Sequence, residues 1–359
     1  MIISRTPFRV SFFGGGTDYP AWYRSNGGQV LATTIDKYCY LTCRYLPPFF
    51  EHKISVAYSK IENCHSVDEI EHPAVRQILK YLAIDRGVAI KYDGDIPARS
   101  GMGSSSAFTV GLLHALHALK GNIPSKGDLA RESIYVEQEL LKETVGSQDQ
   151  MLAAFGGLNH VVFHANNEVT IRPMTLSRDR IKELESHLVL FYTGVTRTAS
   201  AIAQSYGLQN RERELRRLSE MVTEGIAILA SRRDIHEFGE LLHEAWQAKQ
   251  ALSPLVSNSH VAEMYEAARS AGAIGGKLLG AGGGGFMLLF CPPEAQPVVR
   301  EKLAGLIHVP FNFEFSGSQI IYFEPDADYS QEEKLREARP PEPFQELAHL
   351  GERPEVGLA

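Results

Sequence analysis

The chain has 359 residues, of which 44% are hydrophobic and 22% are charged, as in an ordinary soluble globular protein. A single hydrophobic core seldom organises so long a chain, so the length predicts two domains. The net charge of -7 and the pI near 6.0 provide no basic field for nucleic acid or for an anionic membrane, and any phosphate-binding site must therefore be local.

Neither export nor a cysteine metal site is predicted. The four cysteines, Cys39, Cys43, Cys64 and Cys291, lack zinc-ligand spacing and are typical of reduced thiols in a cytoplasm. The first residues contain no apolar signal-peptide segment, and no run approaches the ~18 apolar residues that span a membrane. We expect a cytoplasmic protein with small-molecule partners, and the sequence leaves its oligomeric state open.

The first predicted strand, residues 8 to 13, leads into a glycine-rich loop. The alternation of the strand places Arg9 on the face opposite Phe8. Glycines at positions 14 to 16 permit a tight bend, and Asp18 follows on the loop. A carboxylate there can accept hydrogen bonds from sugar hydroxyls, and an aspartate that only shapes the turn is the alternative.

Three further elements are predicted before the next glycine-rich stretch. Residues 30 to 45 are rich in Val, Ile, Thr and Tyr and predict one or two strands, residues 73 to 86 predict a helix, and residues 87 to 92 predict another strand. The loop at 44 to 53 mixes aromatic and basic side chains. Such a loop could hold an anionic sugar, and a solvated basic loop is the alternative.

Residues 95 to 107 form a glycine- and serine-rich loop that runs into an apolar helix. Gly101 and Gly103 allow positive φ and leave no side chain between the backbone and a ligand. The serines at 104 to 106 favour the N-cap, so the helix should begin among them. A helix start exposes unpaired N–H groups that bind anions, and serine hydroxyls can ligate magnesium. A loop that only caps a core helix is the alternative.

Two common phosphate motifs are excluded. The only Gly-Lys pair, at 276 and 277, lacks the first glycine and the final serine or threonine of a Walker A loop. Gly280, Gly282 and Gly285 fit the spacing of a dinucleotide-binding loop, but residues 286 to 290 predict a short buried strand where that fold requires a helix.

Two acidic residues follow on predicted helices. Asp128 is a plausible N-cap for a helix that runs to about residue 142. Glu137 lies one turn after Ile134, on or beside the apolar stripe, and is either a boundary glutamate or an inward ligand for a metal ion. Asp149 begins a short apolar helix, where the helix dipole alone would stabilise it.

The rest of the chain alternates strands and helices around a polar break at residues 175 to 186, where we place the domain boundary. The predicted strands are residues 158 to 164, 168 to 173, 187 to 192, 286 to 290 and 317 to 323, and the predicted helices are residues 197 to 233, 235 to 252, 260 to 271 and 293 to 305. A tail from residue 325, rich in proline and glutamate, is expected to be peripheral or partly disordered.

Three glycine-rich stretches, at residues 14 to 19, 97 to 107 and 275 to 285, each adjoin a predicted strand or helix. In order, spacing and content they resemble the three motifs of the GHMP kinases, over about residues 1 to 325. The resemblance implies an α/β (α+β) fold with the active site between two domains. They would be an S5-like ATP-binding domain (1–180) and a ferredoxin-like domain (181–325), followed by a tail (326–359).

The resemblance also implies roles for single residues. Asp149 would orient or deprotonate the acceptor hydroxyl, and Arg9 would stabilise charge near that hydroxyl and the γ-phosphate. Magnesium would bind Ser105 and Glu137. The implied ATP-binding residues are Pro97, Arg99, Ser100, Gly101, Met102, Gly103, Ser104, Ser105 and Ser106. The candidate acceptor-binding residues are Gly15, Gly16, Thr17, Asp18, Arg44, Gly282 and Gly283.

Within the family, the sequence is most similar to the bacterial D-glycero-D-manno-heptose 7-phosphate kinases. This implies transfer of the ATP γ-phosphoryl group to the anomeric C1 hydroxyl, giving the 1,7-bisphosphate used for nucleotide-activated heptose and for surface glycans such as lipopolysaccharide or capsule. Gly15 and Gly16 replace the Glu and His of galactokinases, which speaks against free galactose. A kinase for another sugar, such as fucose, or a catalytically silent nucleotide or sugar sensor is the alternative.

A phosphorylated acceptor requires a cation in its pocket, because its charge must be offset there. The candidates from the sequence are Arg44, Lys53, Arg99 and Arg197.

Overall fold

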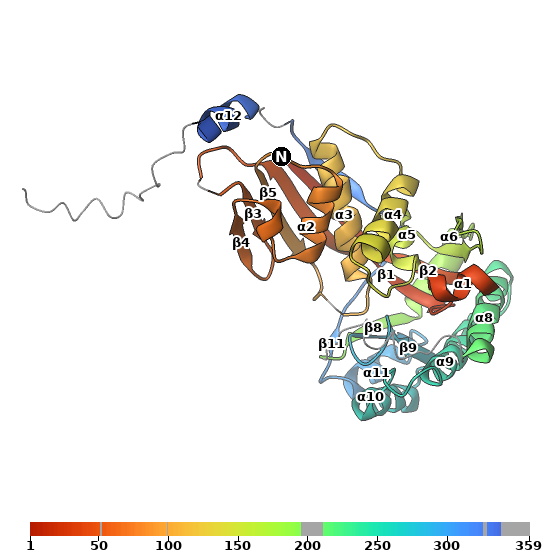
Figure 1. The fold of residues 1–359 in the computed structure, drawn as a ribbon. Helices are drawn as coiled ribbons and strands as arrows, with labels where there is room; N and C mark the ends of the chain where they lie inside the picture. The colour runs from red at the N-terminus through yellow and green to blue at the C-terminus, as the bar shows by residue number, and fades with distance from the viewer. Residues whose placement is uncertain (51, 99, 195–210, 326–328, 339–359) are drawn as a thin grey trace, which may run out of the picture.

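Two β-sheets organise the protein (Figure 1). The computed structural model describes residues 1–359 except 51, 99, 195–210, 326–328 and 339–359. The strands are β1 (Ile2–Phe13), β2 (Gly28–Tyr45), β3 (Ile54–Ala57), β4 (Ile61–Cys64), β5 (Val88–Gly94), β6 (Asn159–Phe163), β7 (Val169–Pro173), β8 (Leu188–Tyr192), β9 (Gly275–Leu278), β10 (Phe286–Phe290), β11 (Ile307–His308), β12 (Phe313–Glu314) and β13 (Gln319–Phe323).

Helices surround both sheets. They are α1 (Pro20–Asn26), the 3-10 turn η1 (Val67–Glu69), α2 (Pro73–Tyr81), α3 (Ser104–Leu119), α4 (Lys126–Tyr135), the π-helical η2 (Val136–Leu140), α5 (Gln148–Phe155), α6 (Arg178–Ser186), α8 (Glu212–Ala230), α9 (His236–Gln250), α10 (Ser259–Ser270), α11 (Gln296–Lys302) and α12 (Ser330–Ala338).

The larger sheet has nine strands, with the path β13-β1-β2-β5-β3-β4; β6 and β12 also pair with β2, and β7 pairs with β6. Strands β1 and β2 are antiparallel, and Arg9 lies opposite Thr34. Helices α2, α3, α4 and α5 lie in front of this sheet in Figure 1. Helix α3 contacts both the sheet and helices α4 and α5. A helix packed on both sides must be apolar almost all round, and nearly all of α3 from Ser106 to Leu116 is buried.

The smaller sheet is antiparallel, with the order β11-β8-β10-β9. All five residues of β10 are buried, which explains the uninterrupted apolar run at 286 to 290. Helix α9 packs against β9, and α10 packs against both β9 and α11. These elements form the lower part of the molecule in Figure 1.

The end of β1 enters the core between the two sheets. The rings of Phe12 and Phe13 lie with their centroids 5.4 Å and 5.0 Å from that of Phe238 on α9. Phe238 in turn lies 6.2 Å from Phe290 on β10. Because these rings are fully buried, they hold the first glycine-rich loop against the second sheet.

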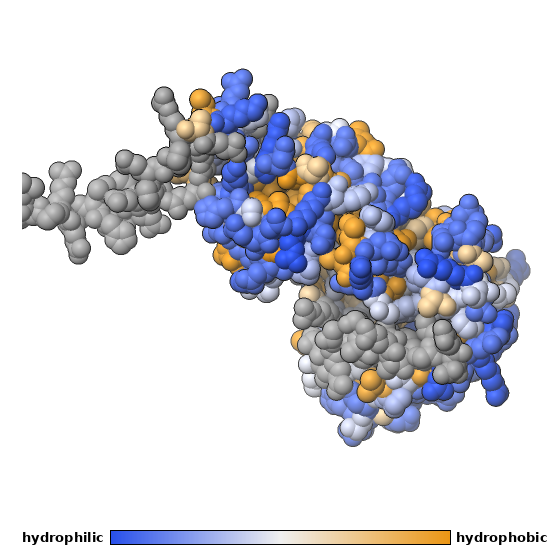
Figure 2. Space-filling view, in the orientation of Figure 1, coloured by the Kyte–Doolittle hydropathy of each residue, from blue (hydrophilic) through white to orange (hydrophobic). Residues whose placement is uncertain are grey.

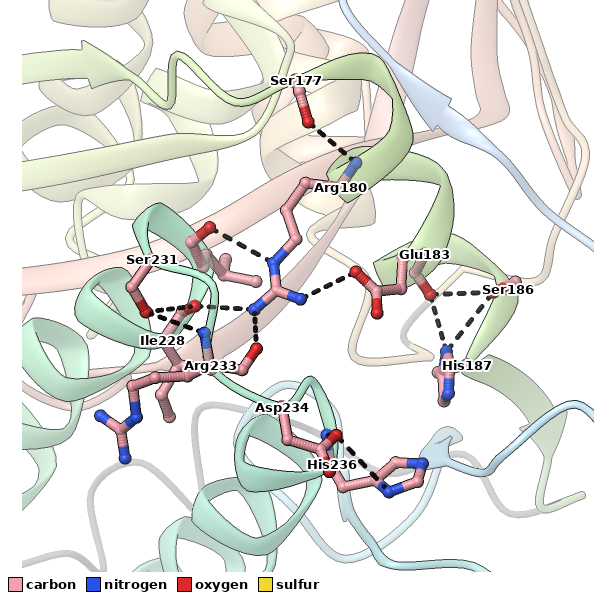
Figure 3. Close-up of polar contacts among 11 residues, drawn as sticks. Ser177, Arg180, Glu183, Ser186, His187, Ile228, Ser231, Arg233, Asp234 and His236 are labelled. Atoms are coloured by element: carbon pink, nitrogen blue, oxygen red, sulfur yellow. Dashed lines mark hydrogen bonds and ion pairs between the residues drawn. The ribbon is translucent and has the colours of Figure 1, made fainter.

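Helix α6 connects the two sheets and is fastened to the end of α8. The Arg180 guanidinium donates hydrogen bonds to the carbonyl oxygens of Ile228 (2.7 Å) and Arg233 (2.9 Å) and pairs with Glu183 at 2.8 Å (Figure 3). Carbonyl groups at the end of a helix lack N–H partners within it and attract a cation. The predicted domain boundary near residue 180 falls in this helix.

The last strands correct the predicted extent of the second domain. Strands β12 and β13 lie in the stretch assigned to it, but Phe313 pairs with Ile35 on β2 and Gln319 pairs with Arg5 on β1. The chain therefore returns to the larger sheet, where β13 covers the outer edge of β1. The described part of the tail forms α12, whose Glu333 accepts a hydrogen bond from the Gly87 N–H at 3.0 Å.

One local prediction is also corrected. The helix expected to be capped by Asp128 is capped by Ser125, and these two residues form a capping box in which Asp128 is the third helical residue. The third glycine-rich stretch, 275 to 285, begins with β9 at residues 275 to 278. The predicted helix 197 to 233 lies partly outside the described residues, and its described part is α8.

The face of the protein in Figure 2 is mainly hydrophilic, with hydrophobic side chains in separate patches. Among the described helices, none is both long and apolar enough to cross a bilayer.

All four cysteines are free and buried, and burial raises the pKa of Cys291 to about 11.

Candidate functional site

The three glycine-rich stretches meet around a cavity of about 390 Å³. Among its lining residues, the first stretch contributes Gly15, Gly16, Asp18 and Tyr19, the second contributes Gly101, Gly103, Ser104, Ser105 and Ser106, and the third contributes Lys277, Leu279, Gly280, Ala281, Gly282 and Gly284. The remaining walls include residues of β1, α5, α8 and α9. Segments separated by more than 250 positions in the sequence therefore share one site.

An ion pair between β1 and α5 forms part of the wall. Arg9 Nε and Nη2 donate to the two carboxylate oxygens of Asp149, each at 2.7 Å, and Nη1 donates to the carbonyl oxygen of Gly101 at 2.7 Å. This bidentate geometry fixes both side chains more firmly than a single contact would. The Arg9 side chain is 7% exposed and that of Asp149 is 22% exposed, so the carboxylate remains accessible from the cavity.

The N-terminus of α3 faces the same cavity. Gly103 is the N-cap residue with φ of 73°, and no side chain caps the helix, so N–H groups of its first turn can donate hydrogen bonds to an anion. Gly101 has φ of 81°, and an added Cβ would lie 2.6 Å from the carbonyl oxygen of Leu279. Glycine at 101 is therefore required both by the backbone conformation and by the approach of the third stretch.

Glu137 is buried beside the start of α3. Its Oε2 accepts hydrogen bonds from Ser106 Oγ at 2.9 Å and from the Gln150 amide at 2.5 Å. Burial raises its pKa to about 8, although these hydrogen bonds favour the ionised form. Thr109 also lies nearby, but its hydroxyl donates to the Ser105 carbonyl oxygen at 3.1 Å.

The surroundings of Glu137 fit a magnesium ion. Its Oε1 is buried and accepts no hydrogen bond within the described part of the chain. An orphaned carboxylate oxygen beside a serine hydroxyl is a suitable donor set for a hard cation. The structure pairs Glu137 with Ser106 rather than with the predicted Ser105, whose side chain is exposed. The π-helical turn at η2 carries Glu137, and such turns are frequent at functional sites.

Asp18 is buried under the first loop. Its carboxylate accepts hydrogen bonds from the Gly16 N–H at 2.9 Å and from the Gln148 amide at 2.8 Å. Burial raises the pKa of Asp18, and the charge of Asp149 adds to the rise. Gly146 makes room for this carboxylate, since an added Cβ there would lie 1.8 Å from Asp18 Oδ2.

Two lysines in the wall are missing from the sequence prediction. Lys249 on α9 and Lys277 on β9 are 7% and 6% exposed and line the cavity. The sequence contains a pattern that could have indicated each of these lysines. Lys249 follows Leu242 and Trp246 at helical spacing on the buried stripe, and Lys277 interrupts an apolar run that became a buried strand.

The other predicted site residues lie outside the cavity lining. Ser100 and Met102 are fully buried, Pro97 is exposed, and Gly283 donates its N–H to the Val256 carbonyl oxygen at 2.9 Å. The buried Thr17 hydroxyl lies within hydrogen-bond distance of the backbone oxygens of Gly14 and Gln29, at 2.8 Å and 2.9 Å. Arg99 and Arg197 lie outside the described residues.

Arg44 does not belong to this site. It is exposed and lies on β2 opposite Ala89 on β5. A strand rises about 3.3 Å per residue, so the run from Thr34, the partner of Arg9, to Arg44 spans roughly 30 Å. Lys53 lies at the same end of the sheet, where its carbonyl oxygen accepts from the Val88 N–H. Neither basic residue lines the cavity.

The chain is similar to known proteins over most of its length. Residues 70–157 match the family model described as GHMP kinases N terminal domain, and residues 226–306 match GHMP kinases C terminal. The chain is 30% identical over 308 residues to the D-glycero-alpha-D-manno-heptose 7-phosphate kinase of Campylobacter jejuni, covering 82% of this chain and 91% of that protein. The chain therefore belongs to the GHMP kinase family. It is a phosphotransferase whose acceptor is an alcohol group.

Two further similarities are informative. A bifunctional fucokinase/GDP-fucose pyrophosphorylase of Arabidopsis thaliana is 28% identical over 83% of this chain and 30% of its own length. A crystal structure of a D-glycero-D-manno-heptose 1-phosphate kinase from Bacteroides thetaiotaomicron has a TM-score of 0.75 at 24% identity and covers 90% of this chain and all of that one. The structural match confirms the predicted mixed α/β GHMP kinase fold.

Proposed function

We propose that the protein is an ATP-dependent sugar kinase that phosphorylates the anomeric C1 hydroxyl of D-glycero-D-manno-heptose 7-phosphate. The product is the 1,7-bisphosphate, a precursor of nucleotide-activated heptose for surface glycans. The observation that carries the kinase assignment is the Arg9–Asp149 pair, which lies in one cavity with the N-terminus of α3. The similarity to the heptose 7-phosphate kinase of C. jejuni supports the choice of acceptor.

In this proposal Asp149 and Arg9 have different roles in catalysis. Phosphoryl transfer passes through a loose transition state, so positioning and charge neutralisation provide most of the catalysis. Asp149 accepts a hydrogen bond from the C1 hydroxyl, and it either orients this hydroxyl or takes its proton. An anomeric hydroxyl is more acidic than an ordinary alcohol and demands less of a base. Arg9 stays charged throughout and offsets the charge that develops between acceptor and phosphate.

The donor phosphates would lie at the start of α3, where N–H groups and the helix dipole favour anions. Glu137 would hold the magnesium ion together with a serine hydroxyl of the first α3 turn, from Ser105 or Ser106. When bound, the ion neutralises charge on the β- and γ-phosphates. Asp18 would accept hydrogen bonds from acceptor hydroxyls.

The test is an ADP-release assay with heptose 7-phosphate and the Asp149→Asn variant. We expect kcat to fall by ~10²–10⁴, the usual range for a general base, with the KM for ATP nearly unchanged. Asp179→Asn is the matched control, because Asp179 also lies in the first turn of a helix but is exposed outside the cavity. Wild-type turnover in Asp149→Asn would remove Asp149 from the chemistry.

A kinase for an unphosphorylated sugar such as fucose is the second candidate, favoured by the similarity to the A. thaliana fucokinase. The same assay with L-fucose, D-galactose and the unphosphorylated heptose separates the two. A kcat/KM for any of these sugars above that for heptose 7-phosphate would replace the first proposal by the second.

A further inference from the structure

Lys249 and Lys277 are buried lysines that have no carboxylate partner among the described residues. No Asp or Glu oxygen lies within 4.0 Å of either ammonium group among the described residues. Burying a charge without an opposite charge is costly, so such a pair in a cavity wall indicates a site that an anion completes.

The hydrogen bonds of the two lysines leave donors free for a ligand. Lys249 Nζ donates to the backbone oxygens of Leu278, at 3.0 Å, and Gly280. Lys277 Nζ donates to the Phe12 carbonyl oxygen at 2.8 Å. An ammonium group has three N–H donors. Within the described part of the chain, Lys249 therefore keeps one donor and Lys277 keeps two.

The neighbouring charges do not neutralise this pair. Arg9 is already paired with Asp149, and its charge opposes protonation of both lysines. The charge of Lys277 also opposes protonation of Lys249. Asp18 favours protonation of both lysines but accepts its own hydrogen bonds from Gly16 and Gln148. Burial is the largest effect and lowers the pKa of Lys277 to about 7 and that of Lys249 well below its ordinary value. A bound anion would reverse this shift.

The position of the pair favours the acceptor over the donor. The Lys277 ammonium group donates a hydrogen bond to the carbonyl oxygen of Phe12, which lies two residues before the loop that carries Gly15, Gly16 and Asp18. The donor already has an anion site at the start of α3. The basic residues that the sequence offered for an acceptor phosphate, Arg44 and Lys53, are outside the cavity.

We propose that Lys249 and Lys277 form an anion subsite that binds the phosphate group of a phosphorylated sugar acceptor through their free Nζ donors. The inference rests on the proposed function and assigns its acceptor specificity to two residues of the second domain. The two lysines bind the phosphate at the end of the acceptor remote from C1, and Asp149 accepts a hydrogen bond from the C1 hydroxyl.

Steady-state kinetics of Lys249→Met and Lys277→Met test this assignment. We expect the KM for heptose 7-phosphate to rise at least tenfold, while the KM for ATP and the kcat/KM for the unphosphorylated heptose stay within about threefold of wild type. Lys249→Arg should recover part of the loss, because it restores the charge. Equal losses for both acceptors would show that the lysines only support the backbone of the third stretch, and a rise confined to the KM for ATP would assign the anion to the donor. Either result overturns the subsite.

A binding measurement separates this proposal from the proposed function. Wild-type protein saturated with a non-hydrolysable ATP analogue and magnesium is titrated calorimetrically with inorganic phosphate, which requires no turnover. We expect binding that weakens from pH 6 to pH 8 as Lys277, whose pKa is about 7, loses its proton, and no such binding in the double Met variant. Phosphate binding without heptose 7-phosphate turnover would reject the proposed acceptor and keep the subsite. Absence of binding to the wild type at pH 7 would overturn the subsite.

Discussion

The two walls of the cavity differ in how their buried charges are balanced. On the wall formed by the larger sheet and its helices, Arg9 and Asp149 neutralise each other through two hydrogen bonds of 2.7 Å. On the wall formed by α9 and β9, Lys249 and Lys277 contact backbone carbonyl groups, and no carboxylate of the described residues lies within ion-pair distance of them.

The difference distinguishes charged groups that are paired within the protein from groups whose opposite charge a ligand would supply. A bidentate pair is satisfied in the free protein, so it can hold a reactive geometry before substrate arrives. In the proposed site the lysines would bind an anion and Glu137 would bind a cation. Burial raises the pKa of Glu137 and lowers that of both lysines in the free protein, and a bound metal ion or anion would reverse each shift by supplying the opposite charge.

A double-mutant cycle on the balanced pair has the largest expected effect. Arg9→Met and Asp149→Asn should each lower kcat by ~10² or more, and the double variant should lose little more than the worse single one, because the two groups act as a unit. The same cycle on the exposed pair of Arg216 and Glu212, 2.6 Å apart, should leave kcat unchanged. Multiplicative losses at Arg9 and Asp149 would show two independent roles and break the contrast between the walls.

Glu137→Gln tests the unbalanced acidic group. The pKa of Glu137 is raised to about 8 from 4.5, so its contribution to stability is fully present below about pH 4.5 and is lost as the pH rises through 8. Glu137→Gln should flatten this part of the stability profile in urea unfolding. It should also raise the magnesium concentration for half-maximal velocity by ~10-fold or more, as the loss of metal-site groups does.

Glu139→Gln is the matched control for this experiment, because Glu139 lies on the same π-helical turn but is exposed. It should change neither the magnesium requirement nor the pH dependence of unfolding. An unchanged magnesium requirement in Glu137→Gln would remove that residue from the metal site.

Gly101→Ala tests the contact between the two walls and has the smallest expected effect. The positive φ and the 2.6 Å approach of an added Cβ to the Leu279 carbonyl oxygen should lower the free energy of unfolding by ~2 kcal/mol or more. The KM for ATP should rise several-fold, because the loop before α3 must move. Gly121→Ala is the control, since Gly121 has φ of 76° but an added Cβ meets nothing within 4 Å. Its cost should be ~1 kcal/mol, without an effect on KM. Equal costs at both positions would show that the walls do not constrain each other there.

Local chemistry made much of the first wall predictable. Alternation in β1 separates Arg9 from the core residue Phe8, and the start of α3 follows from three serines after Gly103. The strand after Gly285 follows from an apolar run too short for a helix. In each case the signal lies within about ten residues, which is the range over which side-chain periodicity and capping act.

Other features depend on segments that are distant in the sequence. Which serine contacts Glu137 depends on the π-helical turn and on the packing of α3, whereas the resemblance to the GHMP kinases implied Ser105. Arg44 has a suitable charge but lies at the far end of a long strand. The return of β12 and β13 to the larger sheet is likewise invisible in a local pattern.

The sequence by itself determined the kinase family, the three glycine-rich stretches and the residues able to carry the chemistry, because these are written in residue type and short-range spacing. Only the tertiary structure decided which charges face each other across the cavity. The Arg9–Asp149 pair joins residues 140 positions apart, and Lys277 reaches Phe12 across 265 positions. Electrostatic balance depends on distance and burial in space, and neither can be obtained from the order of residues along the chain.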